Sequence, residues 1–269
     1  MPELPEVETT RRGIAPYLVG QTVTGAAVRQ AQLRWPVPDL RSLLTGQRLQ
    51  ALDRRGKYLL FRFAHGTLLV HLGMSGSLRV LGVGSAPRPH DHVDLLFARH
   101  CLRLHDPRRF GAMLWATGDP STHPRLRDLG PEPLSSRFDG AYLHGVAQRR
   151  RVAIKNLLMD GRVVVGVGNI YASEALFRAG IHPARASHRI SRTRLDQLVD
   201  EVKTVLAHAI RRGGTTLRDF VNESGEPGYF AQELFVYGRS GKTCKKCASV
   251  IKTRRIGQRA SAYCPQCQR

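Results

Sequence analysis

Apolar residues follow two different periods along this chain. Between residues 21 and 118 they fall in short runs that alternate with polar positions or are rich in β-branched residues, with Gly or Pro separating the runs. Such runs are typical of β-strands. The expected strand regions are 22–28, 47–64, 66–74, 75–82, 90–98, 100–106 and 111–117. Together they predict a β-sandwich or a barrel.

From about residue 138 the apolar residues lie three and four positions apart, which predicts helices over 141–160, 173–180 and 192–212. Residues 124–140 contain three prolines and are expected to link the two parts. Residues 215–234 show little periodicity, so we expect a long ordered loop whose tip is a candidate ligand contact.

The first residues, MPELPEVE, suit the start of a helix. Pro2 and Pro5 fit a first turn, where proline's missing N–H costs nothing and its φ is already helical. Glu3 and Glu6 would lie at the positive end of the helix dipole. This segment alone leaves open whether it does more than begin a helix.

Charge narrows the class of partner. The 269 residues include 42 Lys and Arg against 21 Asp and Glu, a net charge of +21 with a pI near 10.9. Such an excess indicates a polyanion as partner. We find no apolar run of about 18 residues and no signal pattern, which disfavours a membrane and leaves nucleic acid. A genomic bias toward arginine could explain the choice of Arg over Lys, but not the net charge.

The five cysteines predict a metal site in a reducing compartment rather than a disulfide framework. Two CxxC pairs separated by sixteen residues suit one tetrahedral Zn²⁺, and four thiolates leave no position for water, so the metal should be structural. Its ligands would be Cys244, Cys247, Cys264 and Cys267. The intervening hairpin carries cations for phosphate, with a protein-binding zinc ribbon as the alternative: Lys252, Arg254, Arg255 and Arg259. Cys101 is expected to be a small buried residue.

Other motifs are weaker when taken singly. GVGN before a helix could bind phosphate through backbone N–H groups, or could be only a tight turn. The basic run 149–151 with Lys155 could equally be a solvated helix face. Met74 in HLGMSGSLR and Phe110 in DPRRFG could be core residues, or wedges of the kind that enter DNA base steps beside a base-reading arginine.

Taken together, the motifs resemble those of the bacterial formamidopyrimidine-DNA glycosylases, also called 8-oxoguanine DNA glycosylases or AP lyases, over essentially the whole chain. The matching segments are PELPEVE, GKYLL, HLGMSGSLR, DPRRFG, GPEPL, VVGVGNIYASE, GGTTLRDF, PGYFAQEL and the CxxC pairs. The resemblance implies an α+β multidomain fold. Its parts would be an N-terminal catalytic β-sandwich flanked by helices (1–130), a helix–two-turn–helix DNA-binding domain with a lesion-binding loop (131–235), and a zinc-finger β-hairpin (236–269).

The resemblance also implies function. The protein would be a bifunctional glycosylase and AP lyase of base excision repair, acting on oxidised purines in double-stranded DNA. It would carry one structural Zn²⁺, have no membrane partner, and work as a monomer in the bacterial cytoplasm at the nucleoid.

The same resemblance assigns the catalytic residues. Once Met1 is removed, Pro2 would carry the nucleophilic amine, since an α-amino group with a pKa of about 8 is far more often neutral than a lysine near about 10.4. Glu3 would protonate the opening sugar, and Glu6 would support the N-terminal site. Lys57 and Arg259 would donate protons during β- and δ-elimination.

DNA contacts are assigned in the same way. Met74, Arg108 and Phe110 match the triad that fills the gap left by the extruded base, with Arg108 on the orphaned cytosine. Further matching positions are His90, Arg150, Lys155 and Asn169, and position 150 is Arg where Lys also occurs. His71 is expected either to contact DNA or to be structural. Residues 215–227 match the loop that closes over the extruded base.

Two alternatives stay open at this point. The endonuclease VIII branch shares the architecture but prefers oxidised pyrimidines; the intact PELPEVE start and the complete gap-filling triad favour the purine branch. A non-catalytic DNA-binding protein on the same scaffold would be expected to lack Pro2, Glu3 or Lys57, and all three are present.

Overall fold

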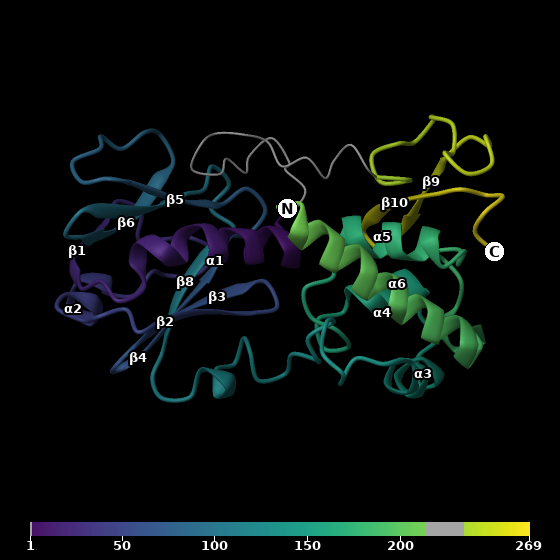
Figure 1. The fold of residues 1–269 in the computed structure, drawn as a ribbon, viewed down its shortest axis with the longest axis horizontal. Coiled ribbons are helices and arrows are strands. Elements are labelled where there is room, and N and C mark those ends of the chain that lie inside the picture. The colour runs from purple at the N-terminus through teal and green to yellow at the C-terminus, as the bar shows by residue number, and fades with distance from the viewer. Residues whose placement is uncertain (1, 214–233) are drawn as a thin grey trace. The chain divides into compact units, whose positions relative to one another are not determined.

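The computed structural model describes residues 2–213 and 234–269, which divide into two compact units (Figure 1). The N-terminal unit contains residues 2–127. The C-terminal unit runs from Asp128 to Arg212 and includes residues 234–269. The lesion-binding loop expected at 215–227 lies outside the described residues. The domain limits expected at 130/131 and 235/236 stay predictions.

Helix α1 (Leu4–Leu18) begins where the first residues predict a helix. Glu3 is its N-cap and Pro5 lies in its first turn, while the Glu6 carboxylate accepts the N–H of Glu3 at 2.8 Å. This reciprocal arrangement satisfies N–H groups that a helix start otherwise leaves without partners. The helix packs against the core of the N-terminal unit through Val7, Ile14 and Leu18.

Eight strands form two antiparallel four-stranded sheets in the N-terminal unit. The first sheet has the order β1 (Val23–Val28), β6 (Asp91–Phe97), β7 (His100–His105), β5 (Ser77–Gly82). The second has the order β2 (Ala51–Arg55), β3 (Tyr58–Phe63), β4 (Gly66–His71), β8 (Ala112–Ala116). Buried residues of both sheets belong to one apolar cluster, so the sheets form the predicted sandwich. Two short helices complete the unit, α2 (Leu40–Leu44) and the 3₁₀ turn η1 (Pro120–Thr122).

An ion cluster around Glu8 attaches α1 to strand β2. The Glu8 carboxylate lies 2.8 Å from Arg11 and Arg12 of its own helix and 3.1 Å from Arg54 of β2. Burial opposes ionisation, but the Arg11 and Arg12 hydrogen bonds and the charges of Arg11 and Arg54 lower the pKa of Glu8 from 4.5 to about 2. Arg11 also donates to the Leu52 carbonyl at 3.2 Å. Because Glu8 lies by Arg54 and the later Arg11 lies by the earlier Leu52, α1 and β2 run in opposite directions. The start of α1 is therefore directed toward the end of β2.

The described part of the C-terminal unit contains four α-helices, a 3₁₀ turn and a hairpin. They are α3 (Gly140–Gln148), α4 (Ile154–Met159), α5 (Asn169–Arg178), η2 (Ser187–Arg189), α6 (Arg192–Arg211), β9 (Lys252–Ile256) and β10 (Arg259–Tyr263). Helix α6 buries a face of residues spaced three and four apart, as the sequence pattern predicts. None of the described helices is long and apolar enough to cross a membrane.

The single helical region predicted over 141–160 is wrong in one respect, because α3 and α4 are separate helices. The chain between them bonds to a distant segment instead of to itself. Ser187 donates its hydroxyl to the Arg150 carbonyl at 2.7 Å and its N–H to the Val152 carbonyl at 2.9 Å. These contacts satisfy carbonyls that a continuous helix would have used.

Candidate active site and nucleic-acid interface

The first turn of α1 places two buried carboxylates beside Pro2. Glu3 and Glu6 are 1% and 2% exposed, and Pro2 is half-buried. The hydrogen bond from the Glu3 N–H to Glu6 fixes the main chain directly after Pro2. The Glu3 carbonyl also accepts the N–H of Val7 at 3.1 Å. The residue that follows the predicted nucleophile is therefore held by a side chain and by the helix itself.

Lys57 lies at the tip of the β2–β3 hairpin. Arg55 pairs with Tyr58, which leaves Gly56 and Lys57 as a two-residue turn, and Gly56 adopts the left-handed φ of 57° that glycine tolerates. Because the start of α1 is directed toward the end of β2, Glu3 and Lys57 lie toward the same end of the N-terminal unit.

His71, the last residue of β4, packs against Tyr58 with ring centroids 4.8 Å apart. Its Nδ1 accepts the N–H of Gly73 at 2.9 Å. Burial first, and then the charges of Lys57 and Arg34, lower the pKa of His71 to about 4. His71 is therefore neutral at cellular pH and carries its proton on Nε2, which makes it a hydrogen-bond donor rather than a cation.

The predicted gap-filling residues lie on two turns that touch each other. Met74 follows β4, and Arg108 and Phe110 lie between β7 and β8. A Cβ at Gly73 would lie 2.4 Å from the carbonyl carbon of Phe110, so only glycine permits this approach. Phe110 is 42% exposed and the Arg108 guanidinium lies 4.8 Å from its ring centroid. His90, exposed before β6, has a left-handed φ of 70°.

Three predicted residues of the C-terminal unit meet at the start of β10. Lys155 is fully buried and its Nζ donates to the Ser261 hydroxyl at 2.7 Å. The Asn169 side-chain amide donates to the Ala260 carbonyl at 3.3 Å. Arg259, the first residue of β10, is exposed. The hairpin therefore contacts α4 and the start of α5, and Arg259 directly precedes the two hairpin residues that make these contacts.

Helix α5 begins at Asn169 with Gly168 as its N-cap, which confirms the helix start predicted directly after the glycines of GVGN. Arg150 forms an ion pair of 2.6 Å with Asp160 and keeps 40% of its side chain exposed. Its neighbours Arg149 and Arg151 are exposed as well. This basic run is thus accessible, while its contact with DNA stays a prediction.

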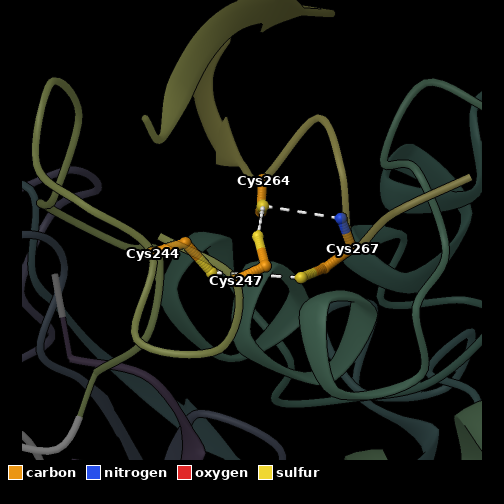
Figure 2. A group of neighbouring side chains, drawn as sticks. All are labelled: Cys244, Cys247, Cys264 and Cys267. Carbon is orange, nitrogen blue, oxygen red and sulfur yellow. Dashed lines mark hydrogen bonds between the residues drawn. The ribbon is translucent and has the colours of Figure 1, made fainter. Parts of the chain in front are cut away.

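The four C-terminal cysteines form a metal-binding cluster (Figure 2). Their sulfurs all lie within 4.8 Å of one another, with 4.0 Å between Cys244 and Cys267 and 3.5 Å between Cys247 and Cys264. A tetrahedron of Zn–S bonds of about 2.3 Å has edges of about 3.8 Å, so these thiols fit Zn²⁺. The predicted structural zinc site is confirmed as a four-thiolate cluster.

Two buried carboxylates, both missed by the sequence analysis, hold site segments in place: Glu174 in the C-terminal unit and Asp106 in the N-terminal unit. Glu174 of α5 is 2% exposed and accepts the N–H groups of Phe235, Val236 and Tyr237 at 2.8–2.9 Å. Burial raises its pKa, although the three N–H bonds act in the opposite direction. Asp106 is fully buried and bonds to Ser75 and to the N–H of Gly111. An acidic residue on the apolar face of a helix was the sequence signal for Glu174.

Comparison with known proteins gives consistent matches along the chain. A model of the formamidopyrimidine-DNA glycosylase N-terminal domain matches residues 1–113, and one of the H2TH domain of these enzymes matches residues 129–221. A zinc finger found in FPG and IleRS matches residues 241–269.

Full-length relatives and solved structures agree with these matches. The formamidopyrimidine-DNA glycosylase of Methylococcus capsulatus is 60% identical over 271 residues and covers all of both chains. The MutM (Fpg) crystal structure from Thermus thermophilus has a TM-score of 0.91 at 38% identity, covering 99% of this chain and 98% of that one. A Lactococcus lactis Fpg variant in complex with Fapy-dG containing DNA has a TM-score of 0.93 at 33% identity, covering 100% of both chains.

A β-sandwich unit that presents a capped N-terminal helix, and a helical unit that ends in a basic four-thiolate hairpin, define a DNA glycosylase of the helix–two-turn–helix class. Within that class, the chain belongs to the formamidopyrimidine-DNA glycosylase family. The family and fold class inferred from the sequence are thereby confirmed. Cys101, 1% exposed in β7, is the small buried residue that was expected. The assigned roles of single site residues stay predictions.

Proposed function

We propose that this enzyme removes oxidised purines, 8-oxoguanine and formamidopyrimidines, from duplex DNA and then cleaves the strand as an AP lyase. The family membership, the net charge of +21 and the relative crystallised with Fapy-dG containing DNA support this substrate. We further propose that it acts as a monomer in the bacterial cytoplasm, at the nucleoid.

The chemistry begins at Pro2 after removal of Met1. The secondary amine attacks C1′ of the damaged nucleotide, and the bond from C1′ to the base breaks with its electron pair leaving on the base. The departing base takes up the proton that the amine releases, and the C1′–O4′ bond then opens to give an iminium while Glu3 protonates O4′. The iminium is cationic at any pH, and it acidifies C2′ for the eliminations that follow.

The observation that carries the proposal is the bond from the Glu3 N–H to Glu6 at 2.8 Å, with both carboxylates at most 2% exposed. General acid catalysis needs a carboxyl held within about 3 Å of the reacting oxygen. Glu6 helps to hold the general acid in place, because its carboxylate accepts the main-chain N–H of Glu3, the residue that follows Pro2.

Elimination needs further proton donors. We assign β-elimination to Lys57, which lies toward the same end of the N-terminal unit as Glu3, and δ-elimination to Arg259 on the zinc hairpin. Zn²⁺ bound by the four cysteines would supply a cross-link that keeps this hairpin folded. Lys155 and Asn169 hold the hairpin by hydrogen bonds to the Ser261 hydroxyl and the Ala260 carbonyl.

Extrusion of the base leaves a gap, and unstacking costs a few kcal/mol. We assign its filling to Met74, Arg108 and Phe110, with His71 as a neutral donor nearby. His90, Arg150, Lys155 and Asn169 are assigned to further DNA contacts, and the phosphate contact among them, assigned to Arg150, would help to set the register of the protein on DNA.

Borohydride trapping tests the proposal. The processed protein is incubated with a duplex that contains one 8-oxoguanine opposite cytosine, reduced, digested and mapped by mass spectrometry. We expect one adduct, on Pro2. A protein that retains Met1 is the matched control, because its proline nitrogen is an amide and should form no adduct. An adduct on another residue, or faster excision of an oxidised pyrimidine than of 8-oxoguanine, would contradict the proposal.

A further inference from the structure

The turn that carries Arg108 and Phe110 is organised around a buried carboxylate. Asp106 is 0% exposed and follows β7 directly. Its Oδ2 accepts the N–H of Gly111, the residue after Phe110, at 2.7 Å, and this bond closes the turn. Its carbonyl accepts the N–H of Arg109 at 3.2 Å, inside the same turn. Arg109 has a left-handed φ of 55°, a conformation that a non-glycine residue keeps only when its surroundings hold it.

The same residue reaches the Met74 turn. Oδ1 of Asp106 accepts the hydroxyl of Ser75 at 2.9 Å, and Ser75 is itself buried. The two turns also touch at Gly73, where a Cβ would clash with the Phe110 backbone. One carboxylate therefore joins the residue after Met74 to the residue after Phe110.

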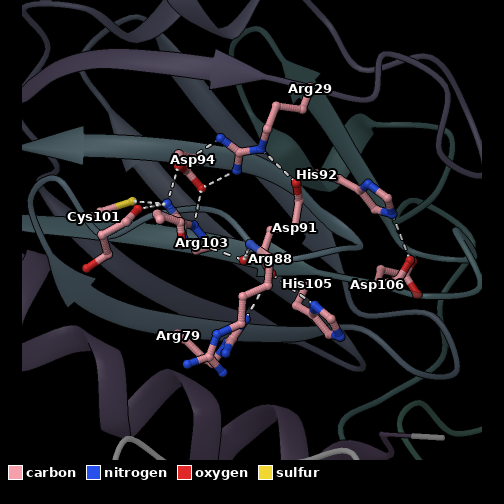
Figure 3. Close-up of polar contacts among 12 residues, drawn as sticks. Arg29, Arg79, Arg88, Asp91, His92, Asp94, Cys101, Arg103, His105 and Asp106 are labelled. Carbon is pink, nitrogen blue, oxygen red and sulfur yellow. Dashed lines mark hydrogen bonds and ion pairs between the residues drawn. The ribbon is translucent and has the colours of Figure 1, made fainter.

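Asp106 also holds the segment around His90. Its N–H donates to the His90 carbonyl at 3.0 Å, and its carbonyl lies 2.9 Å from Nε2 of His92 (Figure 3). His90 is, like Arg109, a non-glycine residue with a left-handed backbone, with φ of 70°. Asp106 therefore bonds to the main chain of His90 itself. It also bonds to a sequence neighbour of each of the other DNA contacts assigned here, Met74, Arg108 and Phe110.

We propose that Asp106 is a positioning residue that sets the geometry of gap filling and of opposite-base reading. The inference rests on the proposed function, because Met74, Arg108 and Phe110 must enter the gap for their positions to matter. A wedge and a base-reading guanidinium have to keep a fixed relation to each other, since a bidentate contact to a base edge is directional. Asp106 provides it by bonding to both turns at once.

The test compares substrates that need gap filling with one that does not. Single-turnover excision is measured on duplexes with 8-oxoguanine opposite cytosine and opposite adenine. Borohydride trapping on a single-stranded oligonucleotide with one abasic site reports the amine chemistry alone, since that strand has no stack to fill and no opposite base to read.

We expect Asp106→Ala to slow duplex excision by at least about tenfold, which equals about 1.4 kcal/mol, the cost expected when a buried N–H loses its acceptor. The preference for cytosine over adenine should shrink toward that of Arg108→Ala. Trapping on the single strand should stay within about twofold of wild type, because the N-terminal site is unchanged. Asp106→Asn should restore most of the duplex rate, as Oδ1 can accept from Gly111 and Nδ2 can donate to Ser75.

Asp94→Asn is the matched control. Asp94 is another buried carboxylate, 4% exposed and located on strand β6 of the sheet that contains β7, but its oxygens bond to Arg29 and Arg103 (Figure 3). This variant should lose stability without losing base discrimination. Should Asp106→Ala fail to fold, Ser75→Ala removes one bond of the same set, and its discrimination should fall in the same direction.

The inference is overturned if folded Asp106→Ala keeps the duplex rate and the discrimination of wild type. It is also overturned if trapping on the single strand falls as far as excision from the duplex. Where Asp106→Ala does not fold, it is overturned if Ser75→Ala discriminates between opposite bases like wild type. Failure of the proposed function looks different, because then the wild-type protein itself would form its adduct on a residue other than Pro2, or would excise an oxidised pyrimidine faster than 8-oxoguanine.

Discussion

Replacing Glu174 with Gln should loosen the zinc hairpin and leave the β-sandwich unchanged. One Glu174 oxygen accepts the N–H groups of Val236 and Tyr237, and the other accepts that of Phe235. Gln has a single acceptor oxygen, so it can keep two of these bonds, and its NH₂ group would then face the N–H of Phe235. The chain that leads into the hairpin would lose one anchor.

The expected cost follows from that one bond. An N–H left without an acceptor costs about 1–3 kcal/mol when it is buried. Burial already raises the pKa of Glu174, which means that its ionised form is not fully stabilised, and we expect a loss in the lower half of that range. With a urea m-value of about 2 kcal/mol/M, the unfolding midpoint should fall by about 0.5–1 M.

Two signals separate the units in one titration. Both tryptophans of the chain, Trp35 and Trp115, belong to the N-terminal unit, so their fluorescence follows the sandwich. Zinc released to a chromogenic chelator follows the hairpin. We expect the zinc transition to shift in Glu174→Gln while the tryptophan transition stays in place.

The control is Asp196→Asn, another carboxylate-to-amide change in the C-terminal unit. Asp196 pairs with Arg192 on the surface, and such pairs contribute about 0–1 kcal/mol. It should shift the zinc transition little. The reasoning is refuted if Glu174→Gln releases zinc at the wild-type urea concentration, or if both transitions move together.

Three further predictions concern other parts of the molecule. Glu8 ionises with a pKa of about 2 in the folded chain and 4.5 when free, so its stabilisation is complete above pH 4.5 and is lost as the pH falls toward 2. The shift corresponds to about 3 kcal/mol, and acid titrations followed by tryptophan fluorescence should lose this dependence in Glu8→Gln; an unchanged acid midpoint would contradict it. Cys264→Ser should lose both zinc and DNA binding while the tryptophan signal shows a folded sandwich, and a metal-free protein of full activity would disprove the role of the site. Arg108→Ala should lose about 1–3 kcal/mol of discrimination between opposite bases, whereas Arg150→Ala should weaken binding to all four alike and lower the salt slope by about one. Binding measured at several salt concentrations decides between them, and equal losses opposite all four bases for Arg108→Ala would make it a phosphate contact.

Local patterns in the sequence predict what local forces decide. The strands of the sandwich are visible because their side chains alternate or are buried in runs, and the zinc cluster is visible because each CxxC pair binds as a local unit. The start of α1 is equally local, since its cap and first turn lie within six residues of the chain start.

Contacts between distant residues could not be predicted in this way. The sequence suggests that Lys155 is a surface cation, but it is buried and donates a hydrogen bond to a hydroxyl of the hairpin, 106 positions further along the chain. Asp106 reads as the first residue of a turn, but its partner Ser75 lies 31 positions earlier. The break between α3 and α4 likewise depends on Ser187. In each case a polar group is satisfied by tertiary structure that the local sequence does not reveal.

Under the proposed mechanism, the bond between Glu6 and Glu3 keeps the acid beside the amine only while the first turn of α1 is formed. Chain ends open and close within nanoseconds to microseconds, and under the proposed mechanism each opening separates the acid from the amine. An N-terminal capping bond worth about 1 kcal/mol raises the closed-to-open ratio about fivefold. Because Glu3, Leu4 and Glu6 are all buried, the first turn of α1 should open only when the sandwich itself unfolds, so turnover on warming should fall together with the tryptophan signal.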